Sequence, residues 1–144
     1  MEKSNKFLKV TGILMIISGS IALLASFFLL IFGVLLGMGA IHHPSSEVIK
    51  TAGLVETGVV LAIVGSIVQF IAGVSGVKNA KNPEKATNLI VLGALTVLFY
   101  LGNQLFNFIG GGNHTYLDYV SILLGMVVPA FYILGAVQLK AKDD

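Results

Sequence analysis

Four long apolar stretches alternate with short polar segments along the chain, and the first runs from Val10 to Ile41 without a charged residue. A helix of about 20 apolar residues is enough to cross the ~30 Å hydrocarbon core of a bilayer. The pattern therefore predicts an all-α fold, a polytopic membrane protein with a bundle of four transmembrane helices in a single domain, residues 1–144. The expected spans are 10–38, 52–77, 86–109 and 119–139.

The first apolar stretch is longer than a bilayer requires. Its thirty-two residues would measure about 48 Å as one helix, at ~1.5 Å per residue. We expect this helix to tilt, to project beyond the bilayer, or to break near Gly33, Gly37 and Gly39. The sequence leaves these three outcomes open.

Small or polar residues form one face of the second stretch, whereas Val, Leu and Ile form the opposite face. In the first stretch, small residues recur at every seventh position. Because small side chains let helices in a membrane approach closely, such rows mark helix contacts. We expect the first two spans to pack against each other through these rows, with the candidate packing residues Gly12, Gly19, Ser26, Gly58, Ala62, Gly65, Gly73 and Gly76.

Polar side chains also recur on the third stretch, where Tyr100, Asn103 and Asn107 are spaced three and four residues apart. Amides in hydrocarbon are costly unless they are hydrogen-bonded, so this face should turn toward protein or a wet cavity. One interpretation is an outward-opening polar pocket between spans two and three, with Gln69 near Tyr100. The other is hydrogen bonding between helices, worth ~1 kcal/mol or less per bond. The candidate ligand-binding residues are Glu56, Gln69, Tyr100, Asn103, Gln104 and Asn107.

The composition also indicates an integral membrane protein, because 56% of the residues are apolar, 11% are charged and the mean hydropathy is +0.92. The absence of cysteine excludes disulfides, zinc–thiolate sites and cysteine nucleophiles. His42, His43 and His114 do not show a spacing that is diagnostic of a metal site. We therefore expect no catalytic residues, no metal, no cofactor and no nucleic-acid partner.

The basic residues are distributed unevenly around the predicted spans. All nine are lysines, and eight of them lie in the N-terminal segment, the loop between spans two and three, and the C-terminal segment. Only Lys50 lies on the other side. By the positive-inside rule, both termini are expected in the cytoplasm, in a multi-pass protein of the plasma membrane.

A weak internal repeat relates the two halves of the chain. The segment LKVTGILMI from Leu8 is similar to LIVLGALTV from Leu89. The second and fourth stretches each end with a glycine, Gly76 or Gly135, that precedes a lysine by a few residues. This similarity predicts two related helical hairpins.

The junction between spans two and three, GVSGVKNAKNPEKATNLIVLGAL at residues 73–95, combines a Gly-rich helix end, a Lys/Asn loop and Pro-Glu-Lys-Ala. Together with the four spans, it resembles small uncharacterised four-helix (tetraspan) membrane proteins of Gram-positive bacteria. This resemblance implies a bacterial plasma membrane and transfers no activity and no site residue. Claudin-like and tetraspanin-like proteins carry Trp and Cys in their outer loops, and this chain contains neither.

These observations favour a small non-enzymatic membrane protein that acts through helix–helix contacts, as an interaction partner or accessory subunit. Besides the lipid bilayer, its partner would be a second copy of itself or another membrane protein. The alternative is a carrier or binding protein for a small or lipid-like molecule, which would use the polar pocket between spans two and three.

Overall fold

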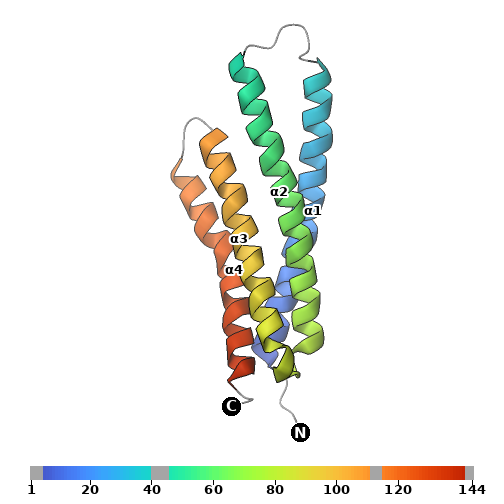
Figure 1. The fold of residues 1–144 in the computed structure, drawn as a ribbon, viewed down its shortest axis with the longest axis vertical. Helices are drawn as coiled ribbons and strands as arrows, with labels where there is room; N and C mark the ends of the chain where they lie inside the picture. Colours follow the sequence, from blue (N-terminus) through green and yellow to red (C-terminus); the bar gives the residue numbers. More distant parts are fainter. Residues whose placement is uncertain (1–4, 40–45, 111–114, 142–144) are drawn as a thin grey trace.

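The computed structural model describes residues 5–39, 46–110 and 115–141, which form a four-helix bundle (Figure 1). The elements are α1 (Lys6–Gly39), α2 (Ser46–Asn79), the short 3₁₀ helix η1 (Pro83–Lys85), α3 (Ala86–Gly110) and α4 (Tyr116–Lys140). All four α-helices are long and apolar enough to cross a membrane. The predicted all-α fold with four candidate transmembrane helices is therefore confirmed.

The four helices form a ring in which each contacts its two neighbours, in the order α1, α2, α3, α4 and back to α1. The start of α1 and the end of α4 lie at the same end of the bundle, which we call the closed end (Figure 1). The described lysines at this end are Lys6, Lys9, Lys78, Lys81, Lys85 and Lys140. The two hairpins lie together at the closed end and diverge toward the other end, which we call the open half (Figure 1).

The bounds of the first two helices differ from the hydropathy pattern. Helix α1 continues without interruption through Gly33 and Gly37 to Gly39, so the break that was one expectation does not occur there. Helix α2 begins at Ser46, six residues before the expected span at residue 52. Hydropathy marks where the membrane ends, whereas a helix with polar side chains can continue into water.

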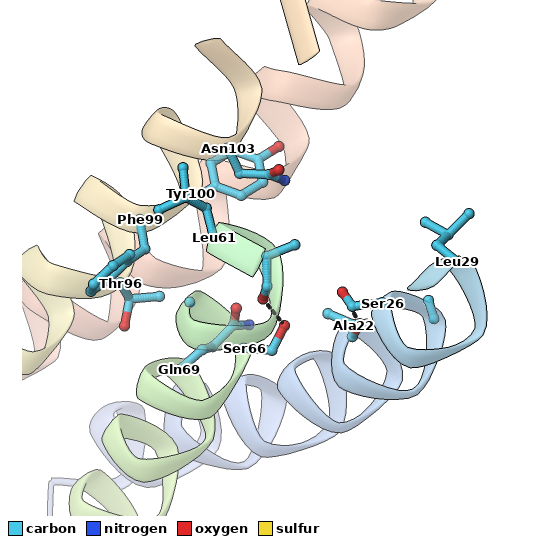
Figure 2. Close-up of a pocket in the computed structure, with 13 residues that line it drawn as sticks. Ala22, Ser26, Leu29, Leu61, Ser66, Gln69, Thr96, Phe99, Tyr100 and Asn103 are labelled. Atoms are coloured by element: carbon cyan, nitrogen blue, oxygen red, sulfur yellow. Dashed lines mark hydrogen bonds between the residues drawn. The ribbon is translucent and has the colours of Figure 1, made fainter. Parts of the chain in front are cut away.

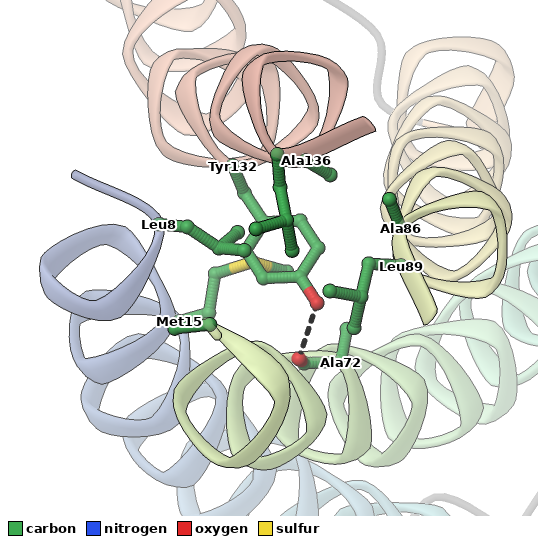
Figure 3. Packing of buried hydrophobic residues seen from close by; sticks show 9 residues of the cluster. Leu8, Met15, Ala72, Ala86, Leu89, Tyr132 and Ala136 are labelled. Atoms are coloured by element: carbon green, nitrogen blue, oxygen red, sulfur yellow. Dashed lines mark hydrogen bonds between the residues drawn. The ribbon is translucent and has the colours of Figure 1, made fainter. Parts of the chain in front are cut away.

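The core of the closed end is built around Tyr132 of α4, which is fully buried between the other helices (Figure 3). Its hydroxyl donates a hydrogen bond of 2.6 Å to the carbonyl oxygen of Ala72 on α2. Gly76 of α2 and Gly93 of α3 lie against its ring, so side chains at these two positions would collide with it. Around the tyrosine pack Leu8, Met15, Leu89, Ala136 and Leu139.

Helices α1 and α2 touch through their backbones. A Cβ atom added to Gly73 would lie 2.7 Å from the carbonyl oxygen of Gly12 and 2.9 Å from the amide nitrogen of Ile16. One added to Gly19 would lie 3.2 Å from the amide nitrogen of Phe70. Glycines at these positions therefore permit an approach that any side chain would prevent.

Two other glycines of the predicted row on α2 face α3 rather than α1. A Cβ atom on Gly65 would lie 3.0 Å from the Cβ of Phe99. One on Gly58 would lie 3.6 Å from the side-chain oxygens of both Asn103 and Asn107. The row therefore contacts α3 as well as α1, and Gly76 at its end contacts Tyr132 of α4.

Asn5 connects the start of α1 to the neighbouring helices of the closed end by hydrogen bonds. Its side-chain oxygen accepts a hydrogen bond from the backbone N–H of Leu8, as an N-cap residue does. Its side-chain nitrogen donates to the carbonyl oxygen of Gly135 on α4, at 2.8 Å. Its backbone N–H donates to the carbonyl oxygen of Ala80 after α2. One residue thus joins three helices.

Buried residues occur at equivalent positions of the two hairpins. On α1 and the residue before it they include Asn5, Leu8, Gly12 and Met15, and on α3, 81 residues later, they include Ala86, Leu89, Gly93 and Thr96. On α2 and the residue after it they include Gly73, Gly76 and Ala80, and on α4, 59 residues later, they include Tyr132, Gly135 and Leu139. Contacts recur as well, since Gly12 faces Gly73 and Gly93 faces Tyr132. The weak sequence repeat therefore corresponds to two hairpins with the same inward faces.

We predict that Gly73→Ala lowers the free energy of unfolding by about 1–3 kcal/mol, because the new methyl group must push α1 away from α2. The control is Gly102→Ala on α3, where no heavy atom lies within 4 Å of the added Cβ. That change should leave stability unchanged or raise it by up to ~1 kcal/mol, since alanine favours the helix. Unfolding by sodium dodecyl sulfate in mixed micelles measures both, and equal effects would contradict the backbone contact.

Candidate functional site

A pocket of about 260 Å³ lies between α1, α2 and α3 in the open half (Figure 2). The helix faces that fill the closed end with large side chains continue into this half, where small residues replace them. The small residues that line the pocket are Ala22, Ala25, Ser26, Ala62, Gly65 and Ser66. Leu29, Leu61 and Phe99 add apolar wall.

Tyr100 of α3 lines the pocket without filling it. Its hydroxyl donates a hydrogen bond of 3.0 Å to the backbone carbonyl of Ser121 on α4. Its ring end lies against Gly125, where a Cβ atom would collide with the phenol. Tyr132 fills the centre of the closed end. Tyr100 is instead hydrogen-bonded to α4 and does not fill the centre of the open half.

The pocket is walled by three helices, since none of its described lining residues comes from α4. Helices α1 and α4 meet at the closed end, where the Phe7 and Phe131 rings pack edge to face with centroids 5.9 Å apart. Leu8 packs against Gly135 at the same end. In the open half the two hairpins diverge (Figure 1).

Three hydroxyl groups in the pocket are already hydrogen-bonded to their own helices. Ser26 donates to the carbonyl of Ala22, Ser66 to that of Ala62, and Thr96 to that of Leu92, at 2.8, 2.6 and 3.0 Å. Such bonds to the carbonyl four residues earlier satisfy a hydroxyl in an apolar setting. These groups therefore present mainly small, neutral surfaces to the pocket.

Two amide side chains supply the remaining polarity. Gln69 Nε2 donates a 2.6 Å hydrogen bond to Ser18 Oγ on α1, and Asn103 Oδ1 accepts one of 3.1 Å from Asn107 Nδ2. No hydrogen bond to Gln69 Oε1 or from Asn103 Nδ2 is present among the described residues. Since no buried polar atom there lacks a partner, these two groups are accessible. The pocket thus offers one acceptor and one donor.

The predicted site residues are only partly brought together. Gln69, Tyr100 and Asn103 line the pocket, where Gln69 is hydrogen-bonded to Ser18 and Tyr100 to α4. Glu56 is exposed and does not line the pocket. Gln104 does not line it either, and Asn107 reaches it only through Asn103.

The sequence analysis missed the contribution of α1 to this pocket. Ala22 and Ala25 line it together with Ser26, on a helix whose other residues at this height are bulky. The sequence signal for these residues is a local cluster of small side chains, Ala22, Ala25 and Ser26, in addition to the row of small residues at every seventh position. The predicted pocket had walls from α2 and α3, and the structure adds α1 as a third wall.

No group of three His, Cys, Asp or Glu residues that could hold a metal ion occurs in the part of the chain that the structure describes. His42, His43 and His114 lie outside that part. In comparisons with known proteins, no family model, no curated protein and no solved structure matches this chain.

Proposed function

We propose that this protein is a binding protein or carrier for the neutral part of a lipid-like molecule, which enters the pocket between α1, α2 and α3. The observation that carries the proposal is the neutral pocket itself, which lies between three of the candidate membrane-spanning helices and has no described lining residue from α4. Apolar walls with a few convergent polar groups are typical of small-molecule sites.

The size of the pocket limits what it can hold. Drug-sized ligands occupy sites of roughly 300–1,000 Å³, and this pocket of about 260 Å³ is slightly smaller. It therefore suits a segment of an acyl chain or a small amphiphile, and not a whole phospholipid. A hydroxyl, ester or amide on the ligand would bind Gln69 Oε1 or Asn103 Nδ2.

A non-enzymatic role is supported by the chemistry of the lining. None of the described lining residues is charged or is a histidine, so no general base adjoins Ser26, Ser66, Thr96 or Tyr100. Their hydroxyls donate to backbone carbonyls, an arrangement that does not activate a nucleophile. The neutral lining also favours an uncharged ligand group, since an unpaired charge is costly at low dielectric.

The proposed location is the plasma membrane, with both termini in the cytoplasm. Six of the seven lysines in the described part of the chain lie at the closed end, and Lys50 lies at the other. Lysine-rich segments favour the cytoplasmic side. In this orientation the pocket lies in the outer half of the membrane.

A second candidate function, as a helix–helix interaction partner or accessory subunit, is favoured by a different observation. Helix α1 carries large exposed apolar side chains beyond the ends of α3 and α4 (Figure 1). A partner chain could cover them, and this partner could be a second copy or another membrane protein.

The topology can be tested with single cysteines, because the chain contains none. We expect a membrane-impermeant maleimide to label Tyr116→Cys in intact cells, since this position is exposed at the open end. Lys81→Cys, exposed at the closed end, should react only after the membrane is permeabilised. The reverse labelling pattern would contradict the proposed orientation.

Binding in the pocket can be tested with a single tryptophan, because the chain contains none. Leu61→Trp places the indole in the pocket wall, and Leu105→Trp places it on the exposed face of α3 as a lipid-facing reference. In vesicles of phospholipid brominated on its acyl chains, we expect comparable quenching of both fluorophores, because a chain segment enters the pocket.

The specificity control fills the pocket. Ala25→Phe should reduce the quenching of Leu61→Trp at least twofold, because the added ring occupies the space beside α1. The same change should leave the quenching of Leu105→Trp unaltered. Strong quenching at residue 105 together with none at residue 61, in the absence of the filling change, would contradict lipid binding in the pocket.

A further inference from the structure

The outer end of α1 stays apolar at a height where the other three helices carry polar residues. Neighbouring helices rise by the same ~1.5 Å per residue, so one known contact fixes the level of other residues. Seventeen residues outward from the Gly12–Gly73 contact, Leu29 of α1 lies level with Glu56 of α2. Leu29 therefore lies at the same height as Glu56, the first acid that α2 carries when it is followed outward from the closed end.

Contacts between α2, α3 and α4 likewise place polar residues of α3 and α4 at this height. Asn107 of α3 faces Gly58 of α2, close to the level of Glu56. Seven residues outward from the Tyr100–Gly125 contact, Asn107 lies level with Asp118 of α4. We call this height the polar level, because α2, α3 and α4 all carry a charged or amide residue there.

The polar level agrees with the thickness of a bilayer. Twenty residues separate Lys9, the last charge before the apolar part of α1, from Leu29 at the polar level. They measure about 30 Å, which is the thickness of the hydrocarbon core. The rest of α1, from Leu30 to Gly39, extends beyond that core, and it contains no charged or polar residue.

Neither a break in α1 nor a tilt would bring this excess length of α1 within the hydrocarbon core. Helix α1 is continuous to Gly39, so it does not break. A tilt of the whole bundle would pull the polar level of α2, α3 and α4 into the hydrocarbon, at a cost for Glu56. A tilt of α1 alone about the Gly12–Gly73 contact would separate Gly19 from Phe70. The projection beyond the bilayer is the outcome that remains.

The side chains of the projecting part that the structure describes are largely exposed. Ile31, Phe32 and Leu35 are 57%, 60% and 61% exposed. On another side of the helix, no heavy atom lies within 4 Å of a Cβ added to Gly33. Lipid tails do not reach this height, so these apolar side chains need a protein partner to remove them from water.

We propose that a second copy of this chain covers the projection, through a parallel contact between the two α1 helices. Two copies in the same orientation have the same projecting apolar residues of α1 at the same height. The projection of each copy can therefore cover that of the other. The uneven lysine distribution favours the same orientation for both copies. The contact brings no like charges together, since α1 has none beyond Lys9.

Four strongly exposed residues of α1 form a seam suited to this contact. Leu24, Phe28, Ile31 and Leu35 are spaced four, three and four residues apart, which is the spacing of the a and d positions in a parallel coiled coil. Leu24 and Phe28 are 67% and 79% exposed. The seam therefore begins inside the membrane and continues into the projection. This inference specifies the partner in the second candidate function and does not depend on the pocket.

Disulfide cross-linking in native membranes tests the seam, because the chain has no cysteine of its own. Ile31→Cys and Leu35→Cys lie on the seam, and Gly33→Cys lies between them in height but on the far face, where space is open. With copper phenanthroline as oxidant, we expect a covalent dimer of the full chain for the two seam variants. Its yield should be at least fivefold higher than for Gly33→Cys.

A second measurement keeps the test independent of chemical reactivity. Light scattering of the detergent-solubilised protein should give the mass of a dimer, and Ile31→Lys with Leu35→Lys should convert it to a monomer with unchanged helix content. Equal cross-linking of all three cysteines, cross-linking only to a different protein, or a monomeric wild-type protein would each overturn the proposal. Each of these outcomes would leave tryptophan quenching in the pocket unaffected.

Discussion

The backbone contact between Gly12 of α1 and Gly73 of α2 determines how the rest of the bundle is arranged. Two helices can approach this closely only where neither carries a side chain, and the atoms around Gly73 leave no space for one. Once this contact is fixed, the equal rise of the helices sets the level of every residue on α1 and α2. The height of the pocket and the surplus length of α1 both follow from that register.

Side-chain size along the same inward faces explains why one end of the bundle is closed and the other open. At the closed end, Tyr132, Leu8 and Leu89 fill the space between the helices, and Asn5 adds hydrogen bonds to α4 and to the end of α2 (Figure 3). In the open half, alanine, serine and glycine occupy these faces (Figure 2). Because the two hairpins are related, their differences are informative: Tyr100 stands where α1 has Gly19, and it turns toward α4.

The sequence predicted the fold class, because long apolar stretches admit few other structures in a membrane. It also indicated that glycines mark close helix contacts, as Gly12, Gly19 and Gly73 do. It did not indicate which neighbour each glycine would face, since the rotation of α2 depends on packing against both α1 and α3. Gly58 and Gly65 therefore face α3, which the row alone could not show.

The candidate site was harder to predict for a related reason. Polar residues could be assigned to heights along each helix, which placed Gln69 near Tyr100, and both line the pocket together with Asn103. Their hydrogen-bond partners, Ser18, Ser121 and Asn107, depend on rotamers and on the divergence of the hairpins. The contribution of α1 also depends on three-dimensional packing, because alanines are common in any apolar helix and only their clustering at one height distinguishes Ala22 and Ala25.

The central claim is that α1 and α4 are close at the closed end and separate in the open half. Distances between paired spin labels test it, with one pair at Val10 and Leu134 and another at Ile21 and Leu123, which lies eleven residues outward on both helices and on nearly the same faces. In lipid nanodiscs, the account predicts a longer mean distance and a broader distribution for the outer pair. Equal mean distances with equally narrow distributions would show parallel helices and a closed bundle, which would contradict it.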